Sequence, residues 1–182
     1  GAPVVGAVYF PWPTQDGGVV MHARRGGGAF VDGEPVALDG LNEPEAGRLA
    51  ALPGSFGGAF RVGGRMRGKA GELRVTGSIA YELAMVAKGV LQYCVTTAPR
   101  IWDVAAGAII VTEAGGAVMV GHRRKRRWPF GASRMVWQPL ESFVPDWQSG
   151  TTTIKKLRDW SAPLVLGSPS VAAYVAESIV GR

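Results

Sequence analysis

Hydrophobic and polar positions follow two different periods along the chain, and the first part has the period of strands. The β-rich run Val4–Phe10 is followed, after the turn residues Asp16-Gly-Gly18, by the apolar run VVMHA. Apolar runs bounded by turn residues predict strands joined by hairpins. The glycine-rich stretch Arg24-Arg-Gly-Gly-Gly-Ala-Phe30 and the pair Asp32-Gly33 predict a further turn, short strand and turn. We therefore expect a piece of antiparallel sheet in residues 1–40.

From residue 72 onward, helical spacing alternates with strand-like runs. A candidate strand at 72–76 is followed by a helix over about 78–88, with Ser78 as its N-cap, Glu82 in its first turn and Gly89 as its stop. The alternation predicts an α/β layer, and together with the antiparallel beginning it predicts a mixed α/β (α+β) fold. The other elements that we expect are strands at 49–52, 90–95, 117–120 and 164–166, and helices at 103–114 and 170–180.

The same pattern predicts two regions of unequal size. Residues 1–40 are expected to be the remnant of an N-terminal antiparallel sheet, and residues 41–182 a C-terminal α/β domain with a long insert at about 121–160. The insert is rich in aromatic residues, for which cover of the core is the default expectation, while a subunit contact or a partner surface stays open. These aromatic residues include Trp128, Trp137, Phe143 and Trp147.

Composition describes a folded globular chain with locally concentrated charge. Of its 182 residues, 47% are hydrophobic and 19% are charged. The net charge is +6, but the run Arg123-Arg-Lys-Arg-Arg127 holds five of the 20 basic residues, and without it 15 basic residues face 14 acidic ones, a balance of +1. We interpret this run as a solvated loop and not as a nucleic-acid site, because no interleaved aromatic pattern accompanies it. No apolar run approaches the roughly 18 residues of a membrane span.

Cysteine and histidine content restricts the chemistry further. The single Cys94 excludes an internal disulfide, and two histidines, His22 and His122, make no zinc-ligand cluster. This favours a reducing compartment, and we expect a cytoplasmic protein. The chain starts with Gly1 and passes directly into the strand-like VVGAVYF, with no leader pattern, so we expect an internal start with residues missing upstream.

Two familiar catalytic patterns were considered, and the sequence completes neither. Gly63-Gly-Arg-Met-Arg-Gly68-Lys69 has the glycine and lysine spacing of a phosphate loop, but Ala70 follows where a Ser or Thr must bind magnesium. None of Ser55, Ser78 and Ser168 lies in the Gly-x-Ser-x-Gly pattern of serine hydrolases. Neither mechanism is predicted.

Asp103 is the most informative acidic residue, since it lies between Trp102 and Val104 at the start of an apolar helix. Taken alone it has an ordinary explanation, because the helix dipole stabilises a first-turn acid by roughly 0.3–1 kcal/mol. Glu113 on the same helix lies ten residues further on, or roughly 15 Å away, and is expected at the surface or in the turn at Gly115-Gly116. A divalent metal would need further oxygen ligands from elsewhere in the fold.

A family resemblance decides how these residues are interpreted. Trp102-Asp103-Val-Ala-Ala-Gly107 followed by Glu113-Ala-Gly-Gly116 resembles the second signature of the inositol monophosphatase family. The glycine-rich hairpin that ends in Phe30 and the stretch that begins Gly77-Ser78-Ile-Ala80 are also similar to that family, over about residues 4–120 and the closing strand and helix. The resemblance implies a layered α/β/α/β/α sugar-phosphatase fold and a Mg²⁺-dependent phosphomonoesterase acting on a small phosphorylated metabolite.

The resemblance also assigns site residues. It implies that Asp103 binds a metal and approaches the substrate, and that the backbone turn Gly77, Ser78 and Ile79 meets the substrate. Family members that act on inositol phosphates commonly have an acid seven residues before this aspartate, where this chain has Thr96, and an aspartate is common where it has Gln92. Inositol phosphate itself is therefore left open beside other sugar or nucleotide phosphates.

The chain departs from the family in its metal ligands. The paired glutamates and the Asp-Pro-x-Asp-Gly-Thr motif are lacking, and Asp39-Gly-Leu-Asn42 only imitates the end of the latter and is interpreted as a turn. We therefore expect this stretch to be the C-terminal two-thirds of such a phosphatase. Because it lacks a complete set of catalytic residues, we expect no appreciable phosphatase activity from this stretch alone. The alternative is a non-catalytic homologue that acts as a regulatory or binding module. A homodimer is possible in either case.

Overall fold

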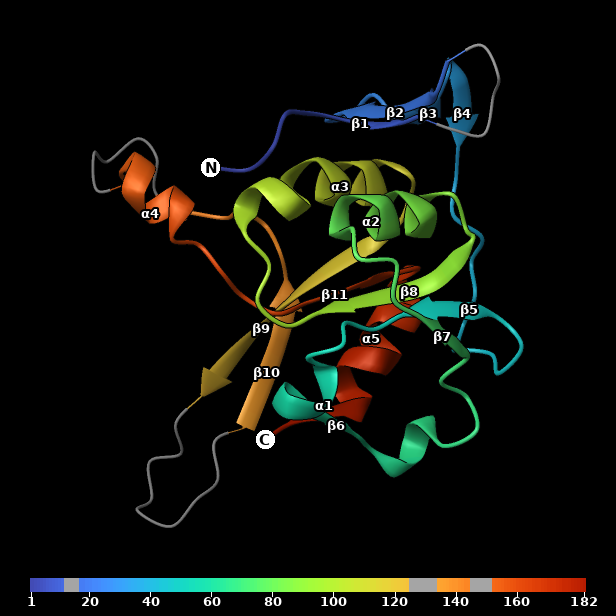
Figure 1. The fold of residues 1–182 in the computed structure, drawn as a ribbon, viewed down its shortest axis with the longest axis vertical. Helices are drawn as coiled ribbons and strands as arrows, with labels where there is room; N and C mark the ends of the chain where they lie inside the picture. Colours follow the sequence, from blue (N-terminus) through green and yellow to red (C-terminus); the bar gives the residue numbers. More distant parts are fainter. Residues whose placement is uncertain (12–16, 125–133, 145–151) are drawn as a thin grey trace.

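Alternating layers of sheet and helix make up the structure (Figure 1). An outer antiparallel sheet lies on helices α2 (Ile79–Ala87) and α3 (Ile101–Glu113), which lie on a mixed six-stranded sheet. Helix α5 (Pro169–Ser178) covers the opposite face of the large sheet. The mixed α/β fold expected from the sequence is confirmed. The computed structural model describes residues 1–11, 17–124, 134–144 and 152–182.

The outer sheet contains four strands in sequential order. Gly6 of its first strand lies so close to α3 that an added Cβ would be 2.6 Å from Ile109 Cγ2, so this position requires glycine for the sheet to contact the helix. Asp32, with φ +48°, and Gly33, with φ +90°, form the expected turn between the last two strands. The strands are β1 (Val5–Phe10), β2 (Val19–Arg24), β3 (Ala29–Val31) and β4 (Glu34–Val36).

The large sheet combines parallel and antiparallel pairs. Its order is β10-β9-β11-β8-β5-β7, in which β5, β7 and β8 run parallel to one another while β11, β9 and β10 pair antiparallel. The carboxyl ends of the three parallel strands therefore meet at one edge of the sheet, which is where ligands bind in many α/β proteins. The strands are β5 (Leu49–Ala51), β7 (Glu72–Arg74), β8 (Leu91–Thr96), β9 (Ala117–Arg124), β10 (Arg134–Pro139) and β11 (Leu164–Gly167).

The two helices of the middle layer pack unusually closely. A Cβ at Gly107 of α3 would lie 2.5 Å from Leu83 Cβ of α2, closer than carbon atoms can approach. The fully buried side chains around this contact include Val86, Val104 and Ile110. The glycine that ends the Trp-Asp signature thus has a packing role.

The chain end differs from the sequence expectation. The helix expected through residue 180 ends at Ser178, because the next three residues extend to pair with another short strand. None of the helices within the described residues combines the length and apolarity that a membrane span needs. Besides β4 and β10, the elements that the sequence pattern missed are α1 (Phe56–Ala59), β6 (Phe60–Val62), the 3-10 turn η1 (Gly64–Met66), α4 (Ile154–Arg158) and β12 (Ile179–Gly181).

The expected insert is partly built into the large sheet. The strand expected to end at Val120 continues to Arg124, because β10 pairs with its outer half. Phe143 is buried and meets the Trp160 ring edge-on at 4.7 Å, while Trp137 packs against Phe60, so both cover core as expected. Trp128 and Trp147 lie outside the described residues.

Candidate functional site

Three connections meet where the parallel strands end, and they form the candidate site. Residues 52–55 follow β5, residues 75–78 follow β7, and residues 97–100 follow β8 and lead into α3. The Ser55 and Thr97 hydroxyl oxygens lie 2.7 Å apart and share a hydrogen bond, which joins two of these connections directly. The sequence only excluded Ser55 from the pattern of serine hydrolases, and no local signal placed it beside Thr97.

The turn before α2 presents backbone N–H groups at this edge. Gly77 has φ +82°, and the Ser78 hydroxyl caps the helix by accepting from the Tyr81 N–H at 3.4 Å, so the expected N-cap is confirmed. The Ser78 carbonyl oxygen accepts a hydrogen bond from the Glu82 N–H. The N–H groups of Ile79 and Ala80 then have no acceptor within the described ranges, and such groups at a helix start favour an anion.

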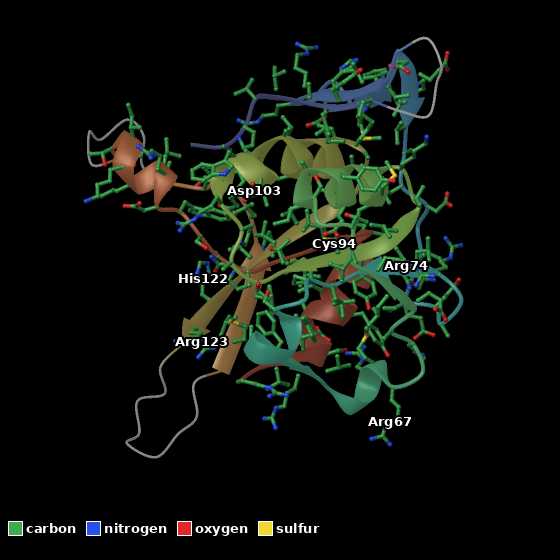
Figure 2. All side chains as sticks on the ribbon, in the orientation of Figure 1. Arg67, Arg74, Cys94, Asp103, His122 and Arg123 are labelled. Carbon is green, nitrogen blue, oxygen red and sulfur yellow. The ribbon has the colours of Figure 1, made fainter. Side chains whose placement is uncertain are left out.

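Asp103 lies at the start of α3 (Figure 2). The helix begins at Ile101, two residues before the position expected from the sequence, because Asp103 Oδ2 accepts a hydrogen bond from the Arg100 backbone N–H at 3.0 Å. This is the capping role of a first-turn acid. The other carboxylate oxygen, Oδ1, has no hydrogen-bond partner among the residues that the structure describes. Asp103 therefore fixes the helix start through one of its two carboxylate oxygens.

Thr96 ends β8 beneath this edge. Its side chain is 2% exposed, and its hydroxyl oxygen accepts a hydrogen bond from the Leu164 N–H at 3.1 Å. Ser55 is exposed and Thr97 is half-buried, and their hydroxyl groups lie on the same side of the sheet. A substrate contact by Thr96 stays a prediction.

A hollow of about 310 Å³ lies beside the turn that begins α2. Polar groups of Thr76 and Ser78 contribute to one side of it. The rings of Phe10 and Tyr81 contribute an aromatic surface; they pack edge-to-face with their centroids 5.5 Å apart. Its size suits a small molecule with both a polar and an apolar part. Its lining residues are Val8, Tyr9, Phe10, Thr76, Ser78, Ala80 and Tyr81.

Gln92, which stands where an aspartate is common in the family that the sequence resembles, lies away from this edge. It is 4% exposed, and its amide oxygen accepts from the Glu45 N–H at 2.8 Å. Its amide nitrogen donates to the carbonyls of Glu45 and Arg48. All of these bonds hold the loop before β5, so Gln92 has a structural role here.

Glu113 lies partly exposed at the surface, as expected, and it also contacts a distant hairpin. Its two carboxylate oxygens accept from the backbone N–H groups of Gly26 and Gly28, at 2.8 and 3.0 Å, in the hairpin between β2 and β3. The Gly26 N–H, more than any other group, holds the pKa of Glu113 below its ordinary value. Glu113 and Gly26 lie 87 residues apart in the sequence, so no local pattern predicts this contact.

A profile of the inositol monophosphatase family matches residues 1–159. The chain belongs to the inositol monophosphatase family. This confirms the resemblance carried by the Trp-Asp signature.

Individual family members match over part of their length. The fructose-1,6-bisphosphatase/inositol-1-monophosphatase of Thermococcus kodakarensis is 39% identical over 121 residues, 64% of this chain and 42% of that protein. The inositol monophosphatase 2 of Saccharomyces cerevisiae is 31% identical over 139 residues, 66% of this chain and 44% of that protein. The chain thus spans less than half the length of these relatives.

Solved structures show the same fold. The inositol monophosphatase from Anabaena (Nostoc) superposes with a TM-score of 0.60 at 18% identity, over 98% of this chain and 60% of that one. The extragenic suppressor protein suhB from Bartonella henselae gives a TM-score of 0.54 at 20% identity, over 88% of this chain and 53% of that one. At these identities the likeness shows the fold alone.

The family's metal would find an incomplete donor set in the described residues. Asp103 offers one carboxylate oxygen, and no group of three His, Cys, Asp or Glu side chains able to hold a metal occurs within those ranges. Mg²⁺ prefers six oxygen ligands in octahedral geometry, of which proteins often supply one or two carboxylates. Asp103 could therefore be one ligand of a magnesium site, which would need further oxygen donors.

The two basic segments of the sequence have other surroundings. In the imitation phosphate loop, Lys69 pairs with Glu43 and Arg65 pairs with Glu177 of α5, both at 2.6 Å. The loop leads into strand β7 and not into a helix, so it lacks the architecture of a phosphate loop. Arg123 (Figure 2) and Arg124 are the last two residues of β9, so this part of the basic run is strand and not the expected loop. Residues 125–127 of the run lie outside the described residues.

Proposed function

We propose that this chain is the substrate-side part of a Mg²⁺-dependent phosphomonoesterase that hydrolyses a small sugar- or inositol-type phosphate. The observation that carries the proposal is the convergence of the Gly77–Ile79 turn, the end of β8 and Asp103 at the carboxyl edge of three parallel strands. Family membership supports phosphatase chemistry for the complete protein.

Each residue has a role within the proposal. The N–H groups of Ile79 and Ala80, together with Gly77 and Ser78, receive phosphate oxygens at the helix start. Asp103 supplies one carboxylate ligand for Mg²⁺, whose chemistry when bound is to polarise the phosphate ester and activate water. Further ligands come from chain outside the described residues.

The hydroxyls on this side of the sheet bear on the substrate class. This chain has Thr96 where an acid is common in the family, and the hydroxyl groups of the exposed Ser55 and the half-buried Thr97 lie beside it. Hydroxyl pairs recognise neutral polyols through hydrogen bonds without requiring a charged partner. We therefore favour a sugar phosphate in which ring hydroxyls meet this pair.

Replacement of Asp103 tests the metal role. In the longest natural polypeptide that contains this chain, Asp103→Asn should lower kcat at least about a hundredfold while the circular dichroism spectrum is retained. Asp39→Asn, in the imitation motif away from this edge, is the matched control and should leave kcat unchanged. Unchanged turnover by the Asp103 variant would contradict the assignment.

A non-catalytic binding module is the second candidate, and it is favoured because the described residues contain no group of three His, Cys, Asp or Glu side chains able to hold a metal. The two candidates differ in one measurement on that same polypeptide. The enzyme releases inorganic phosphate from a sugar phosphate when Mg²⁺ is present, whereas the binding module retains the ester intact. For the 182-residue chain alone, we expect no measurable release.

A further inference from the structure

Four strands on the side of the molecule away from the outer sheet carry arginine as their only charged residue type (Figure 1). Strands β6, β9, β10 and β12 contain no acidic residue and no lysine. Exposed arginines elsewhere, such as Arg48, Arg65 and Arg74, have an acidic partner. A group of arginines without acids attracts anions. We call its four members the arginine surface: Arg61, Arg123, Arg124 and Arg134.

Backbone pairing and close packing bring these strands together, although they are distant in the sequence. Strand β12 pairs antiparallel with β6 and places Val180 opposite Arg61. The next residue, Gly181, lies against β10, since an added Cβ there would be 3.9 Å from Met135 Cβ. Met135 is in turn directly opposite Arg123 in the ladder between β9 and β10. Arg61 and Arg123 therefore belong to neighbouring parts of one surface.

The arginine side chains on this surface are solvent-exposed and lack acidic partners. Arg61, Arg123 and Arg124 are exposed, and none of them forms an ion pair with an acid within the described residues. The register of β9 and β10 places Arg134 directly opposite Arg124. Like charges at directly opposed positions destabilise an antiparallel pair. An anion bound here would offset that repulsion.

Protection of a sheet edge does not explain the arginine surface. Charged residues on an edge strand prevent the strand from pairing with another chain, which would account for an arginine on β10, an edge strand of the large sheet. Arg123 and Arg124 lie on β9, which is paired on both sides, with β10 and with β11. These two arginines therefore need another explanation, and binding of an anion supplies one.

The geometry of β9 favours a flexible polyanion over a flat one. Successive residues of a strand point to opposite faces, so Arg123 and Arg124 lie on different faces of β9. A membrane surface is flat and contacts one face, whereas a single-stranded nucleic acid can bend around the end of a strand. His122 is exposed and shares a face with Arg124, where its ring can stack on a base. Guanidinium groups bind phosphate oxygens through paired hydrogen bonds.

We propose that the arginine surface binds the backbone of a single-stranded nucleic acid, a function beyond hydrolysis of a phosphomonoester. Arg61, Arg123 and Arg124 contact phosphate groups, and His122 stacks on a base. The proposal differs from the interpretation of residues 123–127 as a solvated loop, because the fold makes the first two residues of that run part of a strand and brings Arg61 to them. Binding through phosphate contacts weakens steeply as the salt concentration rises.

The test measures the fluorescence anisotropy of a labelled single-stranded RNA of about 16 nucleotides. The protein is the longest natural polypeptide that contains this chain. Combined replacement of Arg61, Arg123 and Arg124 by Gln removes three cations, so the Kd at about 50 mM KCl should rise at least tenfold. The slope of log Kd against log salt concentration should fall by about 2, because each phosphate contact of a single strand contributes about 0.7.

A second triple variant is the matched control. It combines Arg74→Gln, Lys88→Gln and Arg158→Gln, which remove three exposed cations from other strands and helices. Its Kd should stay within about twofold of the wild type. An equal loss of affinity in the two triple variants would mean that net charge alone governs binding, and would overturn the proposal. Absence of RNA binding by the wild type, or an unchanged Kd in the first variant, would overturn it as well.

Vesicles of phosphatidylcholine and phosphatidylserine distinguish a nucleic acid from a membrane surface. We expect the first triple variant to lose RNA binding and to show no change in vesicle binding. Vesicle binding that is lost in this variant while RNA binding persists would overturn the proposal. If the variant does not retain the circular dichroism spectrum of the wild type, Arg61→Gln alone replaces it. A Kd for RNA about threefold higher then supports the proposal, and an unchanged Kd contradicts it.

Discussion

The two ends of the middle helical layer use the same device for different purposes. At one end, Glu113 of α3 accepts two backbone N–H groups from the hairpin between β2 and β3, and so attaches the outer sheet to the helix. At the other end, Glu82 of α2 accepts two donors from Thr76, in the connection that leads into its own helix. The first contact joins layers that are distant in sequence, while the second fixes a turn at the candidate site.

Their burial differs accordingly. Glu113 lies partly exposed at the surface, where water can replace lost hydrogen bonds, whereas Glu82 is buried between α2 and β8. A partly exposed carboxylate contributes modest stability that depends on pH. A buried carboxyl group with a specific turn as partner contributes order to that turn. Similar contacts therefore attach one layer to another in one place and fix a turn in the other.

The largest effect on stability is expected at the close contact between α2 and α3, which holds the middle layer together. Gly107→Val places a side chain where even a Cβ would lie 2.5 Å from Leu83 Cβ, and should lower the free energy of unfolding by about 3 kcal/mol. Urea denaturation measures this. Gly57→Ala, at an exposed glycine with nothing within 4 Å of an added Cβ, is the control and should change stability by less than about 1 kcal/mol. A Gly107→Val protein as stable as the wild type would contradict the close packing of α2 on α3.

Glu82→Leu should have an intermediate effect on stability. The variant loses two hydrogen bonds to Thr76, each contributing about 1 kcal/mol, but gains apolar burial, so the free energy of unfolding should fall by about 1–2 kcal/mol. Thermal or urea denaturation gives the value. A loss above about 4 kcal/mol would mean that Glu82 supports the whole core, and the contrast with Glu113 would disappear.

Glu113→Gln should lower the free energy of unfolding by about 1 kcal/mol at neutral pH. An amide retains one acceptor for the hairpin but loses the charge-assisted bonds to Gly26 and Gly28, and partial exposure limits the effect. Hydrogen exchange of these two amides provides a local readout, which should accelerate in the variant. Equal exchange rates in both proteins would argue against the contact.

The smallest effect is the pH dependence of the stability difference between the wild type and Glu113→Gln. The folded-state pKa of Glu113 lies below its ordinary value of 4.5, chiefly because of the Gly26 N–H, so the contribution is fully present above this pH and is lost as pH falls through the folded-state pKa. The stability difference between wild type and Glu113→Gln should therefore shrink below about pH 4.5. A difference that grows on acidification would have the wrong sign for this mechanism.

The sequence by itself determined the local elements and the family. Ser78 as a helix cap, the Asp32-Gly33 turn and the apolar helix after Trp102 all follow from short-range preferences of backbone and side chain, and the structure confirms each. The Trp-Asp signature likewise identified the family, because it is contiguous in the chain.

Tertiary structure decided which partners distant residues find. Only the folded chain brings Glu113 to Gly26, the Ser55 hydroxyl to Thr97, and Leu164 to the Thr96 hydroxyl. Local energies leave these pairings open, because each joins residues more than 40 positions apart and is selected by the packing of whole layers. The same reason explains why residues 179–181 became a strand: the backbone pairing offered by β6 outweighed a continued helix.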